Sequence, residues 1–426
     1  MPALSADLEF RGLIHQVTDP SLLDRLDHDR LTAYAGFDPT ADSLHVGHLL
    51  QVLNLRRLQQ AGHRPIALAG GGTGMIGDPG GKSEERNLLS VEDLAVNMAG
   101  IRSQLERFLD FDASAAEARA LLIDNDAWLG TVGLVQFLRD VGKHFTVNQM
   151  VAKESVRARL ERPEQGISYT EFSYMLLQAY DYQQLFDAHD CRLQLGGSDQ
   201  WGNITMGIDL IRRTRQTEVF GLTSPLLLKA DGTKFGKTES GTVWLDARRT
   251  SPYQLYQFLL RSEDATVGTL IRFLTFLDHD TIVGLDAQTA EHPDRREAQR
   301  ALARAVCTLV HGETETRRAE AAADALFSEE ITGLDEAALL DVCADAPTTV
   351  LSRAGLEDMS LVDALVDTGL VKSKGQARTT ISQGGAYINN RRVDVSDRTL
   401  HPDDLLFGRY LVLRRGRRDY HLLRFE

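Results

Sequence analysis

Over its first half, the chain alternates short apolar runs with stretches in which apolar residues recur at helical spacing. Residues 31–37 (LTAYAGF) predict a buried strand, and residues 48–61 predict a helix that stops at Gly62. The apolar stripe of this helix consists of Leu49, Leu50, Leu53, Leu55 and Leu58. Residues 65–69 (PIALA) predict a second strand. This alternation favours an α/β fold in which helices cover a parallel sheet.

The pattern changes along the rest of the chain. A charged stretch predicts a short helical insertion, and a helix-rich region opens at SPYQLYQFLL behind a Ser-Pro helix start. We therefore divide the chain into a first domain (1–223, with the insertion at about 113–162), a linker loop (224–248), an α-helical domain (249–332), a hinge (333–356) and a small α+β domain (357–426).

The segment PTADSLHVGH connects the end of the first predicted strand to the start of the predicted helix. Backbone N–H groups point outward at a helix N-terminus, and the helix dipole favours an anion there. His45 and His48 can donate hydrogen bonds to phosphate oxygens, and Gly47 lets a flat group approach the backbone. The segment therefore indicates a nucleotide site, although two surface histidines beside a loop glycine would give the same short pattern.

A second candidate for phosphate binding lies far downstream, in the loop KFGKT. Lysine is scarce in this chain, with only 8 lysines among 47 basic residues, yet Lys229, Lys234 and Lys237 lie within nine positions. A lysine is a mobile point charge that suits a phosphate group moving during a reaction. The loop could therefore close over a triphosphate and neutralise the leaving pyrophosphate.

HVGH and KFGKT together resemble the HIGH and KMSKS motifs of class I aminoacyl-tRNA synthetases. HVGH differs by one conservative change, and KFGKT keeps both lysines while departing at three positions, as in the bacterial-type tyrosyl-tRNA synthetases. The resemblance runs over essentially the whole chain. It implies a Rossmann-like catalytic domain, an α-helical domain facing the anticodon arm, a C-terminal S4-like RNA-binding domain, and a homodimer.

The glycine-dense loop at 70–86 nearly matches two other motifs. GGTGMIGD satisfies GxGxxG after a strand, but a proline and two glycines follow where that motif needs a helix. The P-loop pattern fails because Ile76 stands where a glycine is required. The resemblance places this loop beside the amino acid and pyrophosphate, which favours a functional Asp78. Lys82 and Arg86, one turn apart, could act as catalytic cations or belong to a solvated helix turn.

A polar stripe runs along the predicted helix YTEFSYMLLQAYDYQQL. Tyr174, Gln178 and Asp181 share one face, which could be solvated surface or could surround a small zwitterion. The resemblance implies that Tyr174 and Gln178 hold the α-amino group of tyrosine together with Asp78. It also implies that Asp181 and Tyr34 bind the phenolic hydroxyl, although Tyr34 could be only a core aromatic.

The strand in LQLGGSDQWGNI ends where ligands of α/β proteins bind. By resemblance Asp199 contacts the ribose of ATP and Gln200 the reacting carboxylate, with Gln194 nearby; an ordinary strand-to-helix turn is the alternative. Asp38 matches a further carboxylate of the tyrosine pocket.

The reaction implied by the resemblance is attack of the tyrosine carboxylate on the α-phosphorus of ATP, followed by transfer to tRNA(Tyr). Thr40 and His45 would stabilise the γ-phosphate side, His48 the ribose side, and Lys234 and Lys237 the pyrophosphate. Mg²⁺ should accompany ATP without a protein cage. The three cysteines are scattered without a CxxC pair, so we expect no structural metal.

The formal charge of −14 argues against a whole surface that binds nucleic acid. From residue 370 onward, however, 12 Lys and Arg stand against 6 Asp and Glu. In this basic tail the S4-like segment offers Lys372, Lys374 and Arg378 at a helix start for RNA, and a small dimer-contact domain is the alternative. No signal-type or membrane-spanning apolar run occurs, so we expect a cytoplasmic protein with no membrane partner.

Three competing hypotheses remain. A tryptophanyl-tRNA synthetase shares the implied fold, but Tyr34 and Asp181 supply partners for a hydroxyl. A synthetase-derived RNA-binding protein without catalysis would not need its histidines and loop lysines intact. An NAD-dependent enzyme rests on GxGxxG alone.

Overall fold

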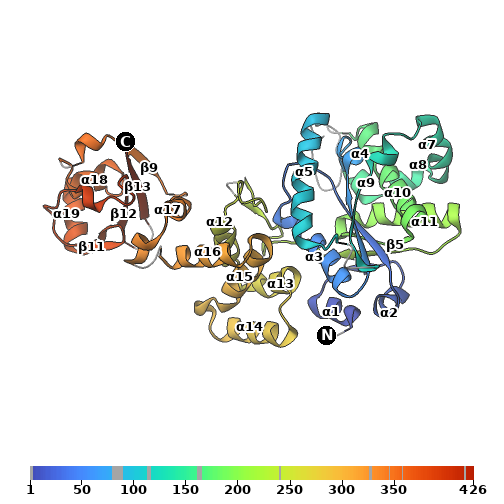
Figure 1. Cartoon of the computed structure of the whole chain (residues 1–426), viewed down its shortest axis with the longest axis horizontal. Coiled ribbons are helices and arrows are strands. Elements are labelled where there is room, and N and C mark those ends of the chain that lie inside the picture. The colour runs from blue at the N-terminus through green and yellow to red at the C-terminus, as the bar shows by residue number, and fades with distance from the viewer. Residues whose placement is uncertain are drawn as a thin grey trace. The chain divides into compact units, whose positions relative to one another are not determined.

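The computed structural model describes residues 3–78, 90–112, 117–160, 166–238, 241–325, 329–344, 346–356, 358–416 and 419–426. The chain divides into two compact units, whose elements are labelled in Figure 1. The first comprises residues 1–250 and 262–302, and the second comprises residues 251–261 and 303–426. The domain boundaries expected from the sequence remain predictions.

The first unit is built on a six-stranded sheet with the strand order β1-β6-β5-β2-β3-β4. All neighbouring strands are parallel except the edge pair β1 and β6, which is antiparallel. The strands are β1 (Gln16–Val17), β2 (Thr32–Phe37), β3 (Arg64–Ala69), β4 (Leu121–Asp124), β5 (Cys191–Gly197) and β6 (Phe220–Ser224). The prediction of a Rossmann-like parallel α/β sheet is confirmed.

The order of the strands determines where a ligand can bind. From β2 the chain continues to β3 and β4 on one side, and it later returns to β5 and β6 on the other. The order therefore reverses between β2 and β5, and ligands of open parallel sheets bind beyond the carboxyl ends of the strands at such a point. Tyr34 on β2 pairs with Gln194 on β5, so both strands bring candidate residues to this place.

Helices cover both faces of this sheet, with α5 on one side and α10 and α11 on the other (Figure 1). The helices of the first unit are α1 (Leu4–Arg11), α2 (Ser21–His28), α3 (Val46–Gln60), α4 (Gly71–Gly74), α5 (Val91–Phe108), α6 (Asp126–Leu129), α7 (Leu134–Asp140), α8 (Val147–Val151), α9 (Glu154–Leu160), α10 (Tyr169–His189), α11 (Trp201–Arg215), α13 (Asp264–Leu274) and α14 (His279–Glu291). α15 (Glu297–His311) begins in this unit and ends in the second.

The prediction that residues 113–162 are helical is wrong in one place, because β4 lies within this stretch and extends the main sheet beside β3. The short segment LLID, with three apolar residues, shows no periodicity that separates a strand from a helix, so only its pairing with β3 decides the matter. The remaining elements of this stretch are helical in the described residues.

The second unit contains helices and a five-stranded sheet with the order β11-β10-β12-β13-β9. Its helices are α12 (Pro252–Leu260), α16 (Glu313–Ala325), α17 (Glu336–Val342), α18 (Leu361–Asp367) and α19 (Lys374–Ser382). Its strands are β9 (Thr348–Leu351), β10 (Ala386–Ile388), β11 (Arg391–Val393), β12 (Tyr410–Arg415) and β13 (Asp419–Phe425).

The stretch expected to be a hinge, 333–356, therefore contains regular structure. β9 pairs in parallel with β13, the last strand of the chain, and belongs to the C-terminal sheet. A pairing across some 70 positions of sequence leaves no local signal, which explains why the linear pattern missed it. No described helix is both long and apolar enough to cross a membrane.

Candidate active site

A cavity of about 400 Å³ lies at the carboxyl ends of β2 and β5. The expected site residues that the structure describes in the first unit all line it: Tyr34, Asp38, Thr40, His45, Gly47, His48, Asp78, Tyr174, Gln178, Asp181, Gln194, Asp199, Gln200, Lys234 and Lys237. Lys82 and Arg86 lie outside the described residues. Segments separated by up to 200 positions thus meet at the point where the strand order reverses.

The two histidines of HVGH lie at the N-terminus of α3: His45 is its N-cap residue and His48 is its third residue. Their rings stack with centroids 3.7 Å apart. A side chain at Gly47 would place its Cβ only 2.8 Å from the ring of His45, so a glycine here allows the two rings to stack. Burial and the positive Lys237 and Lys234 lower the pKa of His45 to about 4. At neutral pH His45 is therefore an uncharged hydrogen-bond donor.

The KFGKT loop is held against HVGH by main-chain hydrogen bonds. Val46 donates its N–H to the carbonyl of Val243 at 3.0 Å, and Val243 donates to the carbonyl of Gly236 at 2.9 Å. Gly236 has a φ of +92°, which glycine adopts without strain. This turn carries Lys234, whose Nζ lies 4.0 Å from a carboxylate oxygen of Asp199. The loop thus brings two exposed lysine side chains to the cavity, beside the N-terminus of α3.

A buried carboxylate occupies the opposite end of the cavity. Asp181 accepts hydrogen bonds from Asn125 Nδ2 at 3.0 Å and from Trp128 Nε1 at 2.7 Å. Burial nevertheless raises the pKa of the Asp181 carboxyl to about 7. The hydroxyl of Tyr34 is buried beside it and has no hydrogen-bond partner among the described residues. A buried acceptor and an unsatisfied buried hydroxyl together suit a ligand that carries a hydroxyl group.

Between these two ends, hydrogen bonds hold two further carboxylates. Asp38 accepts from the hydroxyls of Tyr174 and Thr73, each at 2.9 Å. Asp78 accepts from Gln200 Nε2 at 2.7 Å, and Gln178 Nε2 lies 3.4 Å from Gln200 Oε1. Two neighbouring carboxylates create a negative field, which suits an ammonium group.

Three residues of this site were missed at the level of sequence: Thr73, Asn125 and Trp128. Asn125 is fully buried and donates to the hydroxyl of Thr73 at 3.0 Å as well as to Asp181. It therefore connects the residues around Asp38 with the residues around Asp181. The signal would have been the segment DNDAW at the end of β4, but it is readable only once β4 is recognised as a strand of the sheet.

In the second unit, two of the residues expected to bind RNA, Lys374 and Arg378, lie in α19, and Lys372 lies just before its N-cap residue. Lys372 and Arg378 are exposed, and Lys374 forms an ion pair of 2.5 Å with Asp363. Burial of an apolar cluster between α18, α19 and the sheet positions this helix.

Comparisons with known proteins identify the family of this chain. A model of the family described as "tRNA synthetases class I (W and Y)" matches residues 26–328, and one described as "Tyrosine--tRNA ligase SYY-like C-terminal domain" matches residues 339–423. The chain is thus a class I aminoacyl-tRNA synthetase of the tryptophan and tyrosine group.

Individual relatives distinguish between the tryptophan and the tyrosine enzymes of this group. A tyrosine–tRNA ligase of Roseiflexus castenholzii is 54% identical and covers 100% of both chains; one of Geobacillus stearothermophilus is 50% identical over 99% of each. The solved structure of a C-terminally truncated mitochondrial tyrosyl-tRNA synthetase of Aspergillus nidulans is 33% identical, with a TM-score of 0.68, over 77% of this chain and 95% of that one. This chain belongs to the tyrosine–tRNA ligase family.

Proposed function

We propose that the chain activates L-tyrosine with ATP and then transfers the tyrosyl group to the 3′ end of tRNA(Tyr). The observation that carries this proposal is that the buried Asp181 and the unsatisfied hydroxyl of Tyr34 line the same cavity as the stacked histidines and the loop lysines. Asp181 and Tyr34 select an amino acid with a hydroxyl group, and the histidines and lysines suit a nucleoside triphosphate.

Discrimination against phenylalanine follows from the cost of unpaired buried groups. Phenylalanine in this pocket would leave Tyr34 without its partner and Asp181 short of one donor, and each such loss costs about 1 to 3 kcal/mol. Tyrosyl-tRNA synthetase is itself the reference case for this effect, at about 10⁵-fold, so that figure belongs to this class of enzyme rather than to this structure. Tryptophan also lacks a hydroxyl group that could bind to Tyr34 and Asp181.

In the first step, a carboxylate oxygen of tyrosine attacks the α-phosphorus, the bond to the bridging oxygen breaks, and pyrophosphate leaves. The substrate supplies the nucleophile, so the protein contributes positioning and charge stabilisation. We assign the γ-phosphate side to Thr40 and neutral His45, the ribose to His48 and Asp199, and the pyrophosphate to Lys234 and Lys237, with Lys82 and Arg86 as further candidates. Asp38, Asp78, Tyr174, Gln178, Gln194 and Gln200 would hold the amino acid.

Mg²⁺ is expected to enter with ATP. The aspartates of the cavity are already engaged: Asp38, Asp78 and Asp181 accept hydrogen bonds from protein groups, and Asp199 faces Lys234. In the described part of the chain, no cluster of three His, Cys, Asp or Glu side chains could hold a metal ion. When bound, Mg²⁺ would neutralise charge on the phosphates, which is the usual mode for this ion.

ATP–pyrophosphate exchange without tRNA tests the proposal. Tyrosine alone should support exchange, and phenylalanine and tryptophan should not, because only tyrosine satisfies both Asp181 and Tyr34. Exchange with tryptophan would overturn the assignment of this pocket. No exchange with any of the three would leave an RNA-binding protein without catalysis.

Tyrosine binding should depend on pH through Asp181. With a pKa of about 7, this carboxyl is protonated below pH 7 and then offers the substrate hydroxyl only a neutral, weaker acceptor; above pH 7 the anion accepts a stronger, charge-assisted hydrogen bond. Affinity should therefore increase between pH 6 and pH 8, by at most about tenfold for one group. Calorimetric titration at both pH values measures this, and Asp181→Asn should bind weakly with no such slope. The same slope in that variant would assign the effect to another group.

We also propose that the protein is a homodimer. Large apolar side chains are exposed on α7, α8 and the start of α10: Leu134, Val135 and Leu138, Val147, and Tyr169, with Val135 79% exposed. Exposed apolar groups of this kind mark contact surfaces.

Light scattering should give twice the mass of one chain. Leu134→Glu combined with Val135→Glu should give the mass of one chain, because both positions would then place charge in the contact. Val283→Glu on α14, at a residue 54% exposed, is the matched control and should leave the mass unchanged. A protein that is monomeric before any substitution would contradict this prediction.

A further inference from the structure

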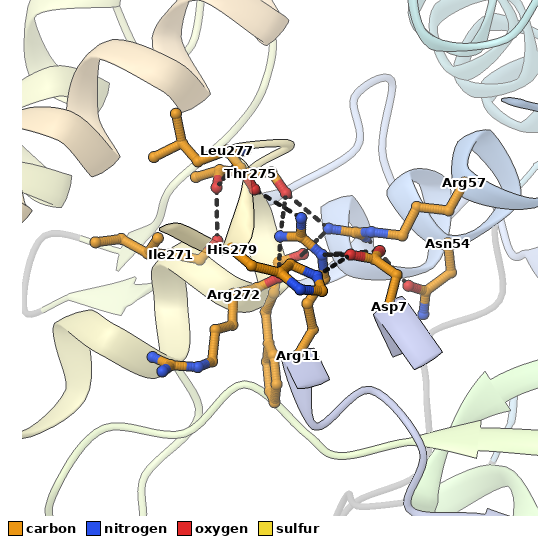
Figure 2. Close-up of polar contacts among 10 residues, drawn as sticks. Asp7, Arg11, Asn54, Arg57, Ile271, Arg272, Thr275, Leu277 and His279 are labelled. Carbon is orange, nitrogen blue, oxygen red and sulfur yellow. Dashed lines mark hydrogen bonds and ion pairs between the residues drawn. The ribbon is translucent and has the colours of Figure 1, made fainter. Parts of the chain in front are cut away.

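Two buried arginines from different helices meet at the end of α13 (Figure 2). Arg11 ends α1 and Arg57 lies in the last turn of α3; they are only 5% and 3% exposed. We call this pair the arginine clamp. Arg57 Nη2 donates to the carbonyls of Phe273 at 3.0 Å and Thr275 at 2.9 Å. Arg11 donates to the carbonyl of Thr275 at 3.1 Å and to that of Leu277 at 2.7 Å.

The clamp satisfies a general need of helix ends. The last four carbonyls of a helix have no partner within it, and they carry the negative end of the helix dipole. Here Thr275 Oγ1 donates to the carbonyl of Ile271, and the guanidinium groups take the carbonyls that follow. Arg11 is also paired with Asp7, which His279 contacts at 2.8 Å.

Burying the charged guanidinium group of Arg57 at this position costs folding free energy. Arg57 forms no ion pair with a carboxylate among the described residues, and its Nε has no hydrogen-bond partner there. Burial, followed by the charge of Arg11, lowers the pKa of Arg57 to about 9. An apolar side chain would fill the same space without this cost. The position therefore uses the guanidinium group for what it holds, namely the end of α13.

The helix that carries Arg57 also carries the catalytic histidines. His45 and His48 lie at the N-terminus of α3, and Asn54 in its third turn donates to Ser224 Oγ at 2.8 Å. Ser224 ends β6, and the chain after it lines the cavity on its way to Lys234. The single helix α3 thus carries the histidines at its N-terminus and contacts the end of β6 through Asn54. Through Arg57 it also contacts the end of α13.

α13 has a special place along the chain. It follows residues 251–261, which belong to the second unit, and α15 leads back to that unit after α14. Residues 262–302 therefore join the second unit at two of its three junctions, 261/262 and 302/303; the third is 250/251. The second unit includes the tyrosine–tRNA ligase C-terminal domain and the exposed basic side chains of α19.

We propose that Arg57, supported by Arg11, is a positioning residue for the tRNA-dependent half of the reaction. It fixes the attachment segment of the RNA-binding unit to the helix that bears His45 and His48. Formation of the adenylate, which needs only the cavity, does not require it. This inference rests on the proposed function, because it assumes transfer to tRNA after activation of tyrosine.

The test uses the full-length protein and measures the two half-reactions separately. Arg57→Gln should leave tyrosine-dependent pyrophosphate exchange within about twofold of the unaltered protein. It should lower kcat/KM for tRNA charging by at least about tenfold, since small misplacements of reacting groups have effects of this size or larger. Arg57→Lys, which keeps a cation near the carbonyls, should recover part of the loss.

Arg56→Gln is the matched control. Arg56 stacks over the same Phe276 ring, at 5.4 Å against 4.8 Å for Arg57, but makes no hydrogen bond to the end of α13 among the described residues. It should charge tRNA at the normal rate. If Arg57→Gln does not fold, Arg11→Lys decides, because lysine keeps the charge but lacks the two separate nitrogens with which Arg11 binds the carbonyls of Thr275 and Leu277; it should lower charging selectively.

If Arg57→Gln or Arg11→Lys lowered pyrophosphate exchange and tRNA charging equally, the arginine clamp would only stabilise the fold. If charging were normal in these variants, the clamp would have no role in positioning the tRNA-dependent step. Either result would overturn the proposal. Failure of the proposed function is distinguishable, because the unaltered protein would then show no tyrosine-dependent exchange.

Discussion

Replacing Lys237 by alanine should slow the formation of tyrosyl-adenylate by about 10² to 10³-fold, the usual effect of removing one group that stabilises transition-state charge. Lys237 lies at the mouth of the cavity, in the hairpin that Val46 and Val243 hold against the N-terminus of α3. It is exposed in the structure, so its ammonium group is free to follow the departing pyrophosphate. Rapid mixing with tyrosine and ATP measures the rate of this step.

The same substitution should barely change the affinity for tyrosine, which equilibrium titration measures. The part of the cavity that we assign to tyrosine contains Tyr34 on β2 and Asp181 on α10, neither of which belongs to the lysine hairpin. Lys229→Ala is the matched control, because Lys229 lies in the preceding turn, where its N–H donates to the carbonyl of Thr233, and does not line the cavity. It should react at the normal rate. An equal loss of tyrosine binding in Lys237→Ala would mean that this lysine is misplaced in the mechanism.

Removing the C-terminal domain should abolish tRNA charging, by more than about 10³-fold, while pyrophosphate exchange remains. Charging depends on contacts to RNA phosphates, which position the nucleic acid, and the basic side chains of α19 lie in the removed part. All residues assigned to tyrosine and ATP lie before residue 250 and remain in the shortened chain. Both activities are measured on one preparation, so retained exchange also shows that the shortened chain is folded.

The structure decides where to end this shortened chain. A cut after Leu356, at the end of the expected hinge, would leave β9 without its partner β13. It would also separate α17 from the C-terminal sheet, where Tyr410 donates to Glu336 at 3.0 Å. A chain that ends at Gly333 avoids both faults. The solved C-terminally truncated relative from Aspergillus nidulans supports its folding. Efficient charging by this chain would contradict the RNA-binding role of the removed domain.

Local patterns were sufficient for much of this protein. The alternation of LTAYAGF, the leucine stripe and PIALA predicted β2, α3 and β3 to within about two residues, because a buried parallel strand and an amphipathic helix each leave a periodic trace in sequence. HVGH and KFGKT were recognisable because phosphate chemistry requires particular side chains at short spacing. The stripe Tyr174, Gln178 and Asp181 was visible because helical spacing places these residues on one face.

Only the tertiary structure decided the rest. β4 and β9 became strands through pairing with β3 and β13, which no local pattern encodes. Asn125, Trp128 and Thr73 became part of the pocket because β4 ends beside α10, and the raised pKa of Asp181 arises from burial. In the sequence, nothing distinguishes Arg57 from other charged residues on a helix. In the structure it donates to the carbonyls of Phe273 and Thr275, more than 200 positions away. Sequence by itself determined the local elements and the chemistry they carry, whereas burial, pairing and long-range hydrogen bonds exist only between segments that folding brings together.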